Sequence, residues 1–391
     1  MSRITMLDPK TLADPYPVYA DLRREAPAVQ IDPDGLWAVT RFSDVVEVLK
    51  RVDDFSSDRP EGDREKLFEQ AFGGKNIIGS DNPTHDRLRS IMQKRFTPRR
   101  LAYMQERVEK LSRELLRPAA TGSDSDLVPD FTVPLPVTVI AELLGVEAER
   151  IDDFKRWSNA LVTIINAADG EERRLALAEV GELAAYLSET ADKRRREPTQ
   201  DLIGALVDAE KEPGRISAGE VLSYCILLLV AGNETTTNLI GGMASALIDN
   251  PDQLALLRDD PSLINNAVEE GLRYCSPVQG LFRHVFNDTE LNGVTIPAGS
   301  RVWVCYASAN RDPERFEDPN RFDIRRDCRG HVAFGWGLHF CLGANLARRE
   351  ARTALAELIP VLSRSELCRP VEWLPSWVIR GPKSLVIRRA A

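Results

Sequence analysis

Hydrophobic and polar positions follow helical spacing over most of the chain. Helical periodicity, interrupted by proline or glycine, recurs in three segments: Thr84 to about Arg113, Glu147 to about Arg196, and Ser217 to Asn250. Ser217 and Glu220 form a capping-box pattern, and Pro251 ends the third segment. This pattern predicts one central helix roughly 50 Å long.

Strand-like alternation is confined to two short regions. Leu36 to Phe42 alternates between apolar and polar residues, and "TELNGVTIPAGSRVWVCYA" does so again after residue 288. An amphipathic helix is expected in "DPYPVYADLRREAP", and a last helix after Cys341. No repeat, low-complexity tract or flexible linker interrupts the sequence, so we expect one continuous domain over residues 1–391, mainly α with small β-sheets.

Composition narrows the function classes. Apolar residues make up 43% of the 391 residues and charged residues 28%, which is typical of a packed globular protein. The net charge of −9 argues against nucleic-acid binding. "MSRITMLDPK" has no signal-peptide core, and the apolar run "CILLLVAG" is too short to span a bilayer, so we expect a cytoplasmic protein without a membrane anchor.

One of the six cysteines has unusual neighbours. The six are scattered, with no C-x-x-C pair, but Cys341 lies among Gly335, Gly337 and Gly343 and just before a predicted helix. Glycines allow positive φ values and close approach to something flat and bulky, and a helix start favours a thiolate. A buried structural cysteine and a nucleophile with His339 as its base are alternatives, but a single-thiolate metal site fits the pattern better.

The segment "FGWGLHFCLG" resembles the haem-binding signature of the cytochrome P-450 family. The resemblance implies a haem b whose iron is ligated by the Cys341 thiolate, bound between the long central helix and the helix that follows the cysteine loop. It also implies that Phe334, Gly335 and Gly343 contact this haem.

Two further motifs support the same family. "AGNETT" in the long helix, starting at Ala231, resembles the family's oxygen-activation stretch, which implies that Ala231 borders the haem and that Glu234 and Thr235 are the acid and alcohol of a proton relay. Haem propionates need cationic partners, and the resemblance assigns these to His85, Arg89, Arg283 and His339.

The resemblance also implies a buried structural triad outside the catalytic machinery. Glu270 and Arg273 have the E-x-x-R spacing that lets them pair on one helix face. Arg315 in "NRDPERF" is expected to complete the triad.

Substrate and partners follow from the resemblance in outline. The distal pocket is expected to be lined mostly by apolar residues, from 68–78, 161–165, Val230, Ala231, 278–282, Trp377 and Val378. Electrons must come from separate proteins, a ferredoxin or flavodoxin with its NAD(P)H-dependent reductase, and the protein is expected to be a monomer. A docking patch for that donor is expected at the arginines Arg325, Arg326, Arg329, Arg348, Arg349 and Arg352.

The predicted function is a haem-thiolate monooxygenase that inserts one oxygen atom from dioxygen into a hydrophobic small molecule of fatty acid, terpenoid, steroid or polyketide type. A peroxide-driven peroxygenase is one alternative, although such relatives tend to lack the pair at Glu234 and Thr235. A haem-based sensor or carrier is another, and the same pair argues against it.

Overall fold

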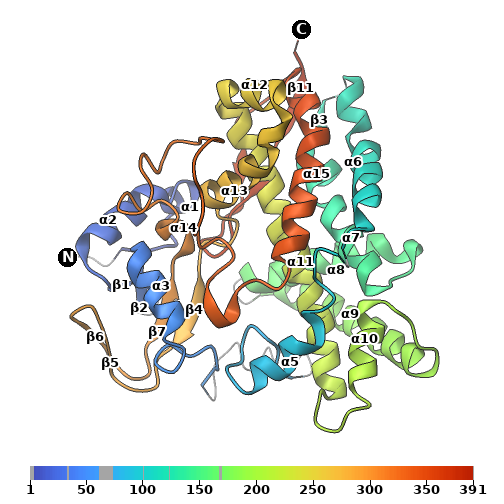
Figure 1. The fold of residues 1–391 in the computed structure, drawn as a ribbon, viewed down its shortest axis with the longest axis vertical. Helices are drawn as coiled ribbons and strands as arrows, with labels where there is room; N and C mark the ends of the chain where they lie inside the picture. The colour runs from blue at the N-terminus through green and yellow to red at the C-terminus, as the bar shows by residue number, and fades with distance from the viewer. Residues whose placement is uncertain are drawn as a thin grey trace. The chain divides into compact units, whose positions relative to one another are not determined.

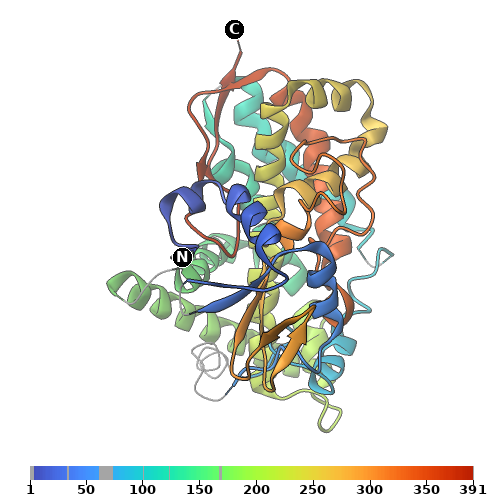
Figure 2. The same ribbon diagram turned by 90° about the vertical axis from the view of Figure 1, so that its left-hand side faces the viewer.

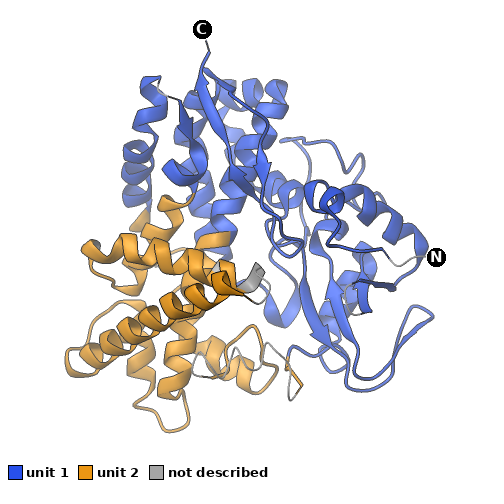
Figure 3. Ribbon diagram, turned by 180° about the vertical axis from the view of Figure 1, so that it is seen from behind, with its two compact units in different colours: residues 1–57, 105–132, 235–391 blue, residues 58–104, 133–234 orange. Residues whose placement is uncertain are grey.

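A computed structural model describes residues 4–32, 35–60, 74–99, 101–122, 124–166 and 170–390. Contacts divide the described chain into two compact units (Figure 3), unit 1 with residues 1–57, 105–132 and 235–391 and unit 2 with residues 58–104 and 133–234. The chain passes from one unit to the other several times, so neither unit is continuous in sequence. The expectation of one domain over residues 1–391 stays a prediction.

Helices are the main regular structure of both units, which confirms the mainly α fold class (Figure 1). Unit 2 contains α5 (Thr84–Met92), α7 (Pro134–Leu144), α8 (Ile151–Asn166), α9 (Glu171–Arg196) and α10 (Leu202–Ala209). Unit 1 contains α1 (Pro9–Ala13), α2 (Tyr16–Glu25), α3 (Phe42–Lys50), nearly all of α6 (Met104–Thr121), α12 (Pro251–Asp259), α13 (Ile264–Cys275), α14 (Tyr306–Ala309) and α15 (Ala344–Leu362).

The predicted long helix is α11 (Ala218–Asp249), which begins in unit 2 and ends in unit 1. The expected capping box is present, because Ser217 N–H donates to Glu220 Oε2 at 2.8 Å and Glu220 N–H donates to Ser217 Oγ at 3.2 Å. In contrast, the periodic segment from Thr84 to Arg113 is two helices, α5 and α6. Pro98 explains the break, since it disfavours helical backbone at the residue before it.

The strands form small sheets, and all of those described lie in unit 1. A four-stranded sheet has the order β1 (Val29–Ile31), β2 (Leu36–Val39), β7 (Arg301–Val304), β4 (Leu281–His284), with β2 and β7 parallel and the other pairs antiparallel (Figure 2). The others are the hairpin of β5 (Thr289–Leu291) and β6 (Val294–Ile296), the pair β9 (Glu372–Trp373) and β10 (Pro382–Ser384), and the trio β3 (Ser125–Asp126), β11 (Val386–Arg389) and β8 (Ser365–Leu367).

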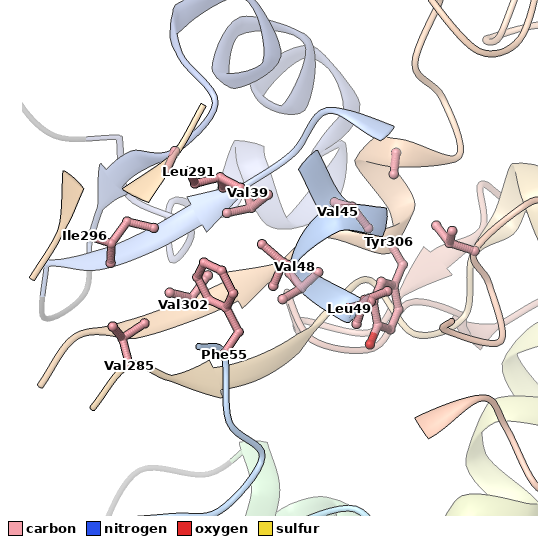
Figure 4. Packing of buried hydrophobic residues seen from close by; sticks show 14 residues of the cluster. Val39, Val45, Val48, Leu49, Phe55, Val285, Leu291, Ile296, Val302 and Tyr306 are labelled. Atoms are coloured by element: carbon pink, nitrogen blue, oxygen red, sulfur yellow. The ribbon is translucent and has the colours of Figure 1, made fainter. Parts of the chain in front are cut away.

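Helix α3 covers one face of the four-stranded sheet. Val45, Val48 and Leu49 recur at the spacing of one helix face and pack with Val39 and Val302 of the sheet (Figure 4). This core anchors α3, which contacts the loop described below.

Among the residues described, no helix combines the length and the apolar composition that crossing a membrane requires.

Candidate functional site

The loop before α15 holds Cys341 in unit 1. A short 3₁₀ turn, Gly337–His339, lies within the loop, and Cys341 N–H donates a hydrogen bond to the carbonyl of Phe334 at 2.9 Å. This hydrogen bond closes the loop on itself and fixes the backbone that carries the sulfur.

Two of the three glycines have the predicted left-handed backbone, with φ of +70° at Gly335 and +65° at Gly337. A Cβ on Gly337 would lie 3.2 Å from the carbonyl oxygen of Leu49 at the end of α3. The prediction of positive φ was wrong for Gly343, where φ is −84°, because this residue caps α15. A Cβ on Gly343 would lie 4.0 Å from Cys341 Sγ, so this glycine is next to the sulfur.

The surroundings of Cys341 suit a large apolar group. Cys341 is half-buried, and the ring of the neighbouring Phe340 is 41% exposed. No three histidine, cysteine, aspartate or glutamate side chains among the described residues are grouped so that they could hold a metal ion. A metal at Cys341 would therefore need to bring its remaining ligands with it, as a haem does.

Arg283 is a buried cation without a counter-charge among the described residues of its unit. It is 4% exposed, its Nη1 donates to the carbonyl of Phe282 at 2.8 Å, and none of the described carboxylates pairs with it. Burial raises the pKa of Tyr306. The charge of Arg283 and its hydrogen bond with the Tyr306 hydroxyl oppose this rise, so the two side chains are in contact. That hydroxyl would be 3.9 Å from a Cβ on Gly335, so Arg283 faces the cysteine loop through Tyr306.

His339 lies in the same loop, where its Nε2 is 3.0 Å from Ser57 Oγ. Unit 1 thus brings together six of the predicted haem-binding residues: Arg283, Phe334, Gly335, His339, Cys341 and Gly343. An uncompensated buried guanidinium beside a glycine-bearing thiol loop fits a cofactor that has both a metal and acidic groups.

In unit 2, His85 and Arg89 lie one turn apart on α5. His85 is fully buried, and its Nδ1 is 3.1 Å from Asp86 Oδ1. Burial raises the pKa of the Tyr224 hydroxyl on α11. The charge of Arg89 lowers the same pKa by a smaller amount, so Arg89 acts on this hydroxyl. The two predicted propionate partners therefore lie on one helix of this unit.

The predicted oxygen-activation stretch is an uninterrupted part of α11. Gly232 packs closely against α7 in unit 2, because a Cβ there would lie 3.1 Å from Ile140 Cγ1. Ala231 is exposed, and Asn233 is fully buried, with its Nδ2 donating to Ser158 Oγ at 2.6 Å and to Glu234 Oε1 at 3.5 Å.

Glu234 is the titratable group of this stretch. Burial raises its pKa to about 7. Its carboxyl group is therefore close to half protonated at neutral pH. Thr235, which follows it, is half-buried and belongs to unit 1.

The predicted buried ion pair of Glu270 and Arg273 is confirmed, but the prediction that Arg315 completes a triad with them was wrong. Arg273 Nε and Glu270 Oε2 are 2.7 Å apart, and both side chains are fully buried. Arg315 is exposed and donates to the carbonyl of Arg329, whereas Arg326 approaches Glu270 at 3.4 Å. Arg326 is the second of the two arginines after "NRFDI", where the chain returns to α13.

Two of the segments expected to line the substrate pocket are adjacent in unit 1. Gln279 N–H donates to the carbonyl of Val378 at 2.8 Å, and the rings of Phe282 and Trp377 meet edge to face at 5.7 Å. Residues 68–73 of another expected segment lie outside the described residues.

Several contributors to the site escaped prediction from sequence. Ser57 and Tyr306 lie 282 and 35 positions before the loop residues His339 and Cys341 and belong to no motif. Glu269, which pairs with Arg348 just after the cysteine loop, was also missed although it is adjacent to Glu270. Neighbouring residues of a helix point about 100° apart, so Glu269 and Glu270 cannot share one partner. This angle was the signal that Glu269 has a partner of its own.

Comparisons with known proteins show the family of this chain. The family model "Cytochrome P450" matches residues 25–363. Cytochrome P450 107B1 of Saccharopolyspora erythraea is 42% identical over 95% of this chain and 94% of its own length, and the vitamin D(3) 25-hydroxylase of Pseudonocardia autotrophica is 42% identical over 94% and 92%. The crystal structure of myxobacterial cytochrome P450 CYP267B1 in complex with myristic acid is 36% identical, covers 99% of both chains and has a TM-score of 0.91. The chain therefore belongs to the cytochrome P450 family and is a haem-thiolate monooxygenase that transfers one oxygen atom from dioxygen to a hydrophobic small molecule.

Proposed function

We propose that the Cys341 thiolate ligates the iron of a haem b. The observation that carries this proposal is the cysteine loop itself, with its Cys341 N–H to Phe334 carbonyl hydrogen bond and two left-handed glycines. Phe334, Gly335 and Gly343 would contact the haem from the loop, and Ala231 from α11. A haem with a thiolate ligand supplies an iron that activates dioxygen.

The haem propionates would pair with four side chains. Arg283 is the strongest candidate, because a buried guanidinium without a carboxylate partner is costly until an anion joins it. His339 would hold a propionate from the cysteine loop, and His85 and Arg89 would do so from α5. Each of them offers a nitrogen hydrogen-bond donor.

Glu234 and Thr235 would deliver protons during oxygen activation. With a pKa of about 7, the Glu234 carboxyl group can both hold and release a proton at neutral pH. The amide of Asn233, at 3.5 Å from Glu234 Oε1, would help to orient the carboxyl group. Thr235 would pass the proton on through its hydroxyl group.

The substrate would be a hydrophobic molecule of fatty acid, terpenoid, steroid or polyketide type. One relative is named for vitamin D(3), and one solved relative contains myristic acid. The backbone pairing of Gln279 with Val378 brings two of the expected lining segments together, while the Phe282 and Trp377 rings themselves pack into the core around Trp303.

Electrons would come from a ferredoxin or flavodoxin and its NAD(P)H-dependent reductase, with this chain acting as a monomer. Three of the six predicted docking arginines are paired with carboxylates, namely Arg326 with Glu270, Arg329 with Asp327 and Arg348 with Glu269. The other three, Arg325, Arg349 and Arg352, have no carboxylate partner in the described chain. They would therefore form the docking patch. The cytoplasmic location stays a prediction.

The decisive experiment is the absorption spectrum of the reduced protein with carbon monoxide. Thiolate ligation moves the Soret band to a characteristic long wavelength. The purified holoenzyme should show this band, and Cys341→Ala should lack it, while Cys368→Ala, at a half-buried cysteine outside the loop, should keep it. A Cys341→Ala protein with an unchanged band would refute the assignment of the ligand.

A further inference from the structure

Glu269, on α13 in unit 1, joins two side chains that come from different parts of the sequence. Its carboxylate accepts two hydrogen bonds from Arg348 of α15, from Nε at 2.7 Å and from Nη2 at 2.9 Å. Its Oε2 is also 3.1 Å from Nε2 of His331. Since His331 Nδ1 accepts from Ala333 N–H at 3.2 Å, the ring proton belongs on Nε2 and is donated to Glu269.

This carboxylate is held in its ionised form. Burial raises the pKa of Glu269, but the hydrogen bonds from His331 and Arg348 and the charge of Arg348 outweigh burial and lower the pKa to about 2. The Glu269–Arg348 pair is thus a bidentate charged contact with fixed geometry. It connects α13 to α15.

Two of these residues, Arg348 and His331, lie against the ring of Phe334. The Arg348 guanidinium lies over this ring at 4.5 Å from its centroid, and the ring centroid of His331 lies 6.1 Å from it. Phe334 in turn accepts the hydrogen bond from Cys341 N–H at 2.9 Å. A continuous set of contacts therefore leads from Glu269 through Arg348 and Phe334 to the backbone of Cys341.

We propose that Glu269 and Arg348 are positioning residues for the Cys341 thiolate. They fix the Phe334 ring from the side and thereby keep the Phe334 carbonyl aligned with Cys341 N–H. Arg348 then acts inside the protein, whereas the sequence pattern had suggested that it docks an electron donor. This proposal rests on Cys341 being the haem ligand.

Loss of Arg348 would remove a cation from the face of the Phe334 ring and a hydrogen-bond donor from Glu269. A cation over an aromatic ring stabilises the position of that ring, and without Arg348 the Glu269 carboxylate keeps only the hydrogen bond from His331 among the described residues. We expect the thiolate-ligated carbon monoxide complex of Arg348→Gln to convert to an inactive form roughly fivefold faster than that of the unchanged protein. Arg348→Lys keeps the charge but lacks the planar fork, so its rate should lie between the two.

The test uses the holoenzyme reduced chemically with dithionite, so that no electron-donor protein takes part. The rate at which the thiolate-type Soret band is lost under carbon monoxide is measured for Arg348→Gln, Arg348→Lys and Glu269→Gln. Arg349→Gln is the matched control, because it removes the adjacent arginine, whose hydrogen bond goes to Gln105. This control should lose the band at the unchanged rate.

A double-mutant cycle tests whether Arg348 acts through Phe334. Phe334→Leu and Arg348→Gln should each accelerate loss of the band, and the double variant should be hardly faster than the faster single one. Additive effects would overturn the proposal, as would an Arg348→Gln rate equal to that of Arg349→Gln. If Arg348→Gln yields no holoenzyme, the same comparison with Arg348→Lys decides. An unchanged protein without the thiolate band would instead refute the proposed function.

Discussion

Glu234 shows how a single residue acquires its chemistry from its place in the fold. A glutamate followed by threonines on a helix is ordinary in sequence, and the same pattern on a helix surface would have a carboxyl group with an acidic pKa. Burial raises the pKa of Glu234 to about 7, which is the range that a proton donor at neutral pH requires. The acidity of this group is therefore a property of its environment.

The raised pKa makes a prediction about stability. Between pH 4.5 and about 7 the folded chain binds more protons at Glu234 than the unfolded chain, so stability falls as pH rises through this window. Glu234→Gln removes the ionisation. The variant should match the unchanged protein near about pH 5 and exceed it near about pH 8 by about 1–2 kcal/mol in thermal or urea unfolding.

The exposed Glu189 on α9 provides a control, since Glu189→Gln should show no such dependence on pH. A stability difference for Glu234→Gln that is the same at both pH values would contradict the raised pKa.

At the scale of single elements, local patterns were reliable where neighbours in sequence decide the structure. The span of α11 and its capping box were predicted, and so were the left-handed Gly335 and Gly337. The break between α5 and α6 was missed although Pro98 marks it. Helical periodicity continues on both sides of that proline, which masked the local break.

The cysteine loop makes a prediction at this scale. Gly337→Ala combines two penalties, a left-handed backbone and a Cβ 3.2 Å from the Leu49 carbonyl oxygen, so we expect a loss of about 1–3 kcal/mol and partial loss of the thiolate band. Gly299→Ala is the matched control, because its φ is +79° but a Cβ there would meet nothing within 4 Å. Equal losses in the two variants, measured by thermal unfolding, would show that the contact with α3 is unimportant.

At the scale of the whole molecule, charge distribution matters more than net charge. The protein carries −9 overall, yet Arg348, Arg349 and Arg352 lie along α15 close enough that the first two contribute, after burial, to lowering the pKa of Arg352. Because Glu269 already pairs with Arg348, the local positive potential comes from Arg349 and Arg352, and such a potential would attract an acidic partner.

Reversing that local charge should slow electron delivery. We expect Arg349→Glu with Arg352→Glu to reduce the rate of reduction by a ferredoxin or flavodoxin about tenfold at low salt, and less at high salt because salt screens the attraction. Reduction by dithionite should not change. The control Arg388→Glu reverses an arginine of β11 that already pairs with Glu366. A rate that is equally low at all salt concentrations would contradict steering by charge.

The sequence by itself determined the features that depend on near neighbours: the helical class, the long helix, the glycine-bearing loop around Cys341 and the identity of the family. Only the tertiary structure decided that Arg326 and not Arg315 approaches Glu270, that Arg283 is buried with no carboxylate partner in the part of the chain that is described, and that Arg348 covers Phe334. The reason is physical. Burial and ion pairing depend on residues that lie far apart in the chain, and no local pattern specifies which of several arginines reaches a given carboxylate.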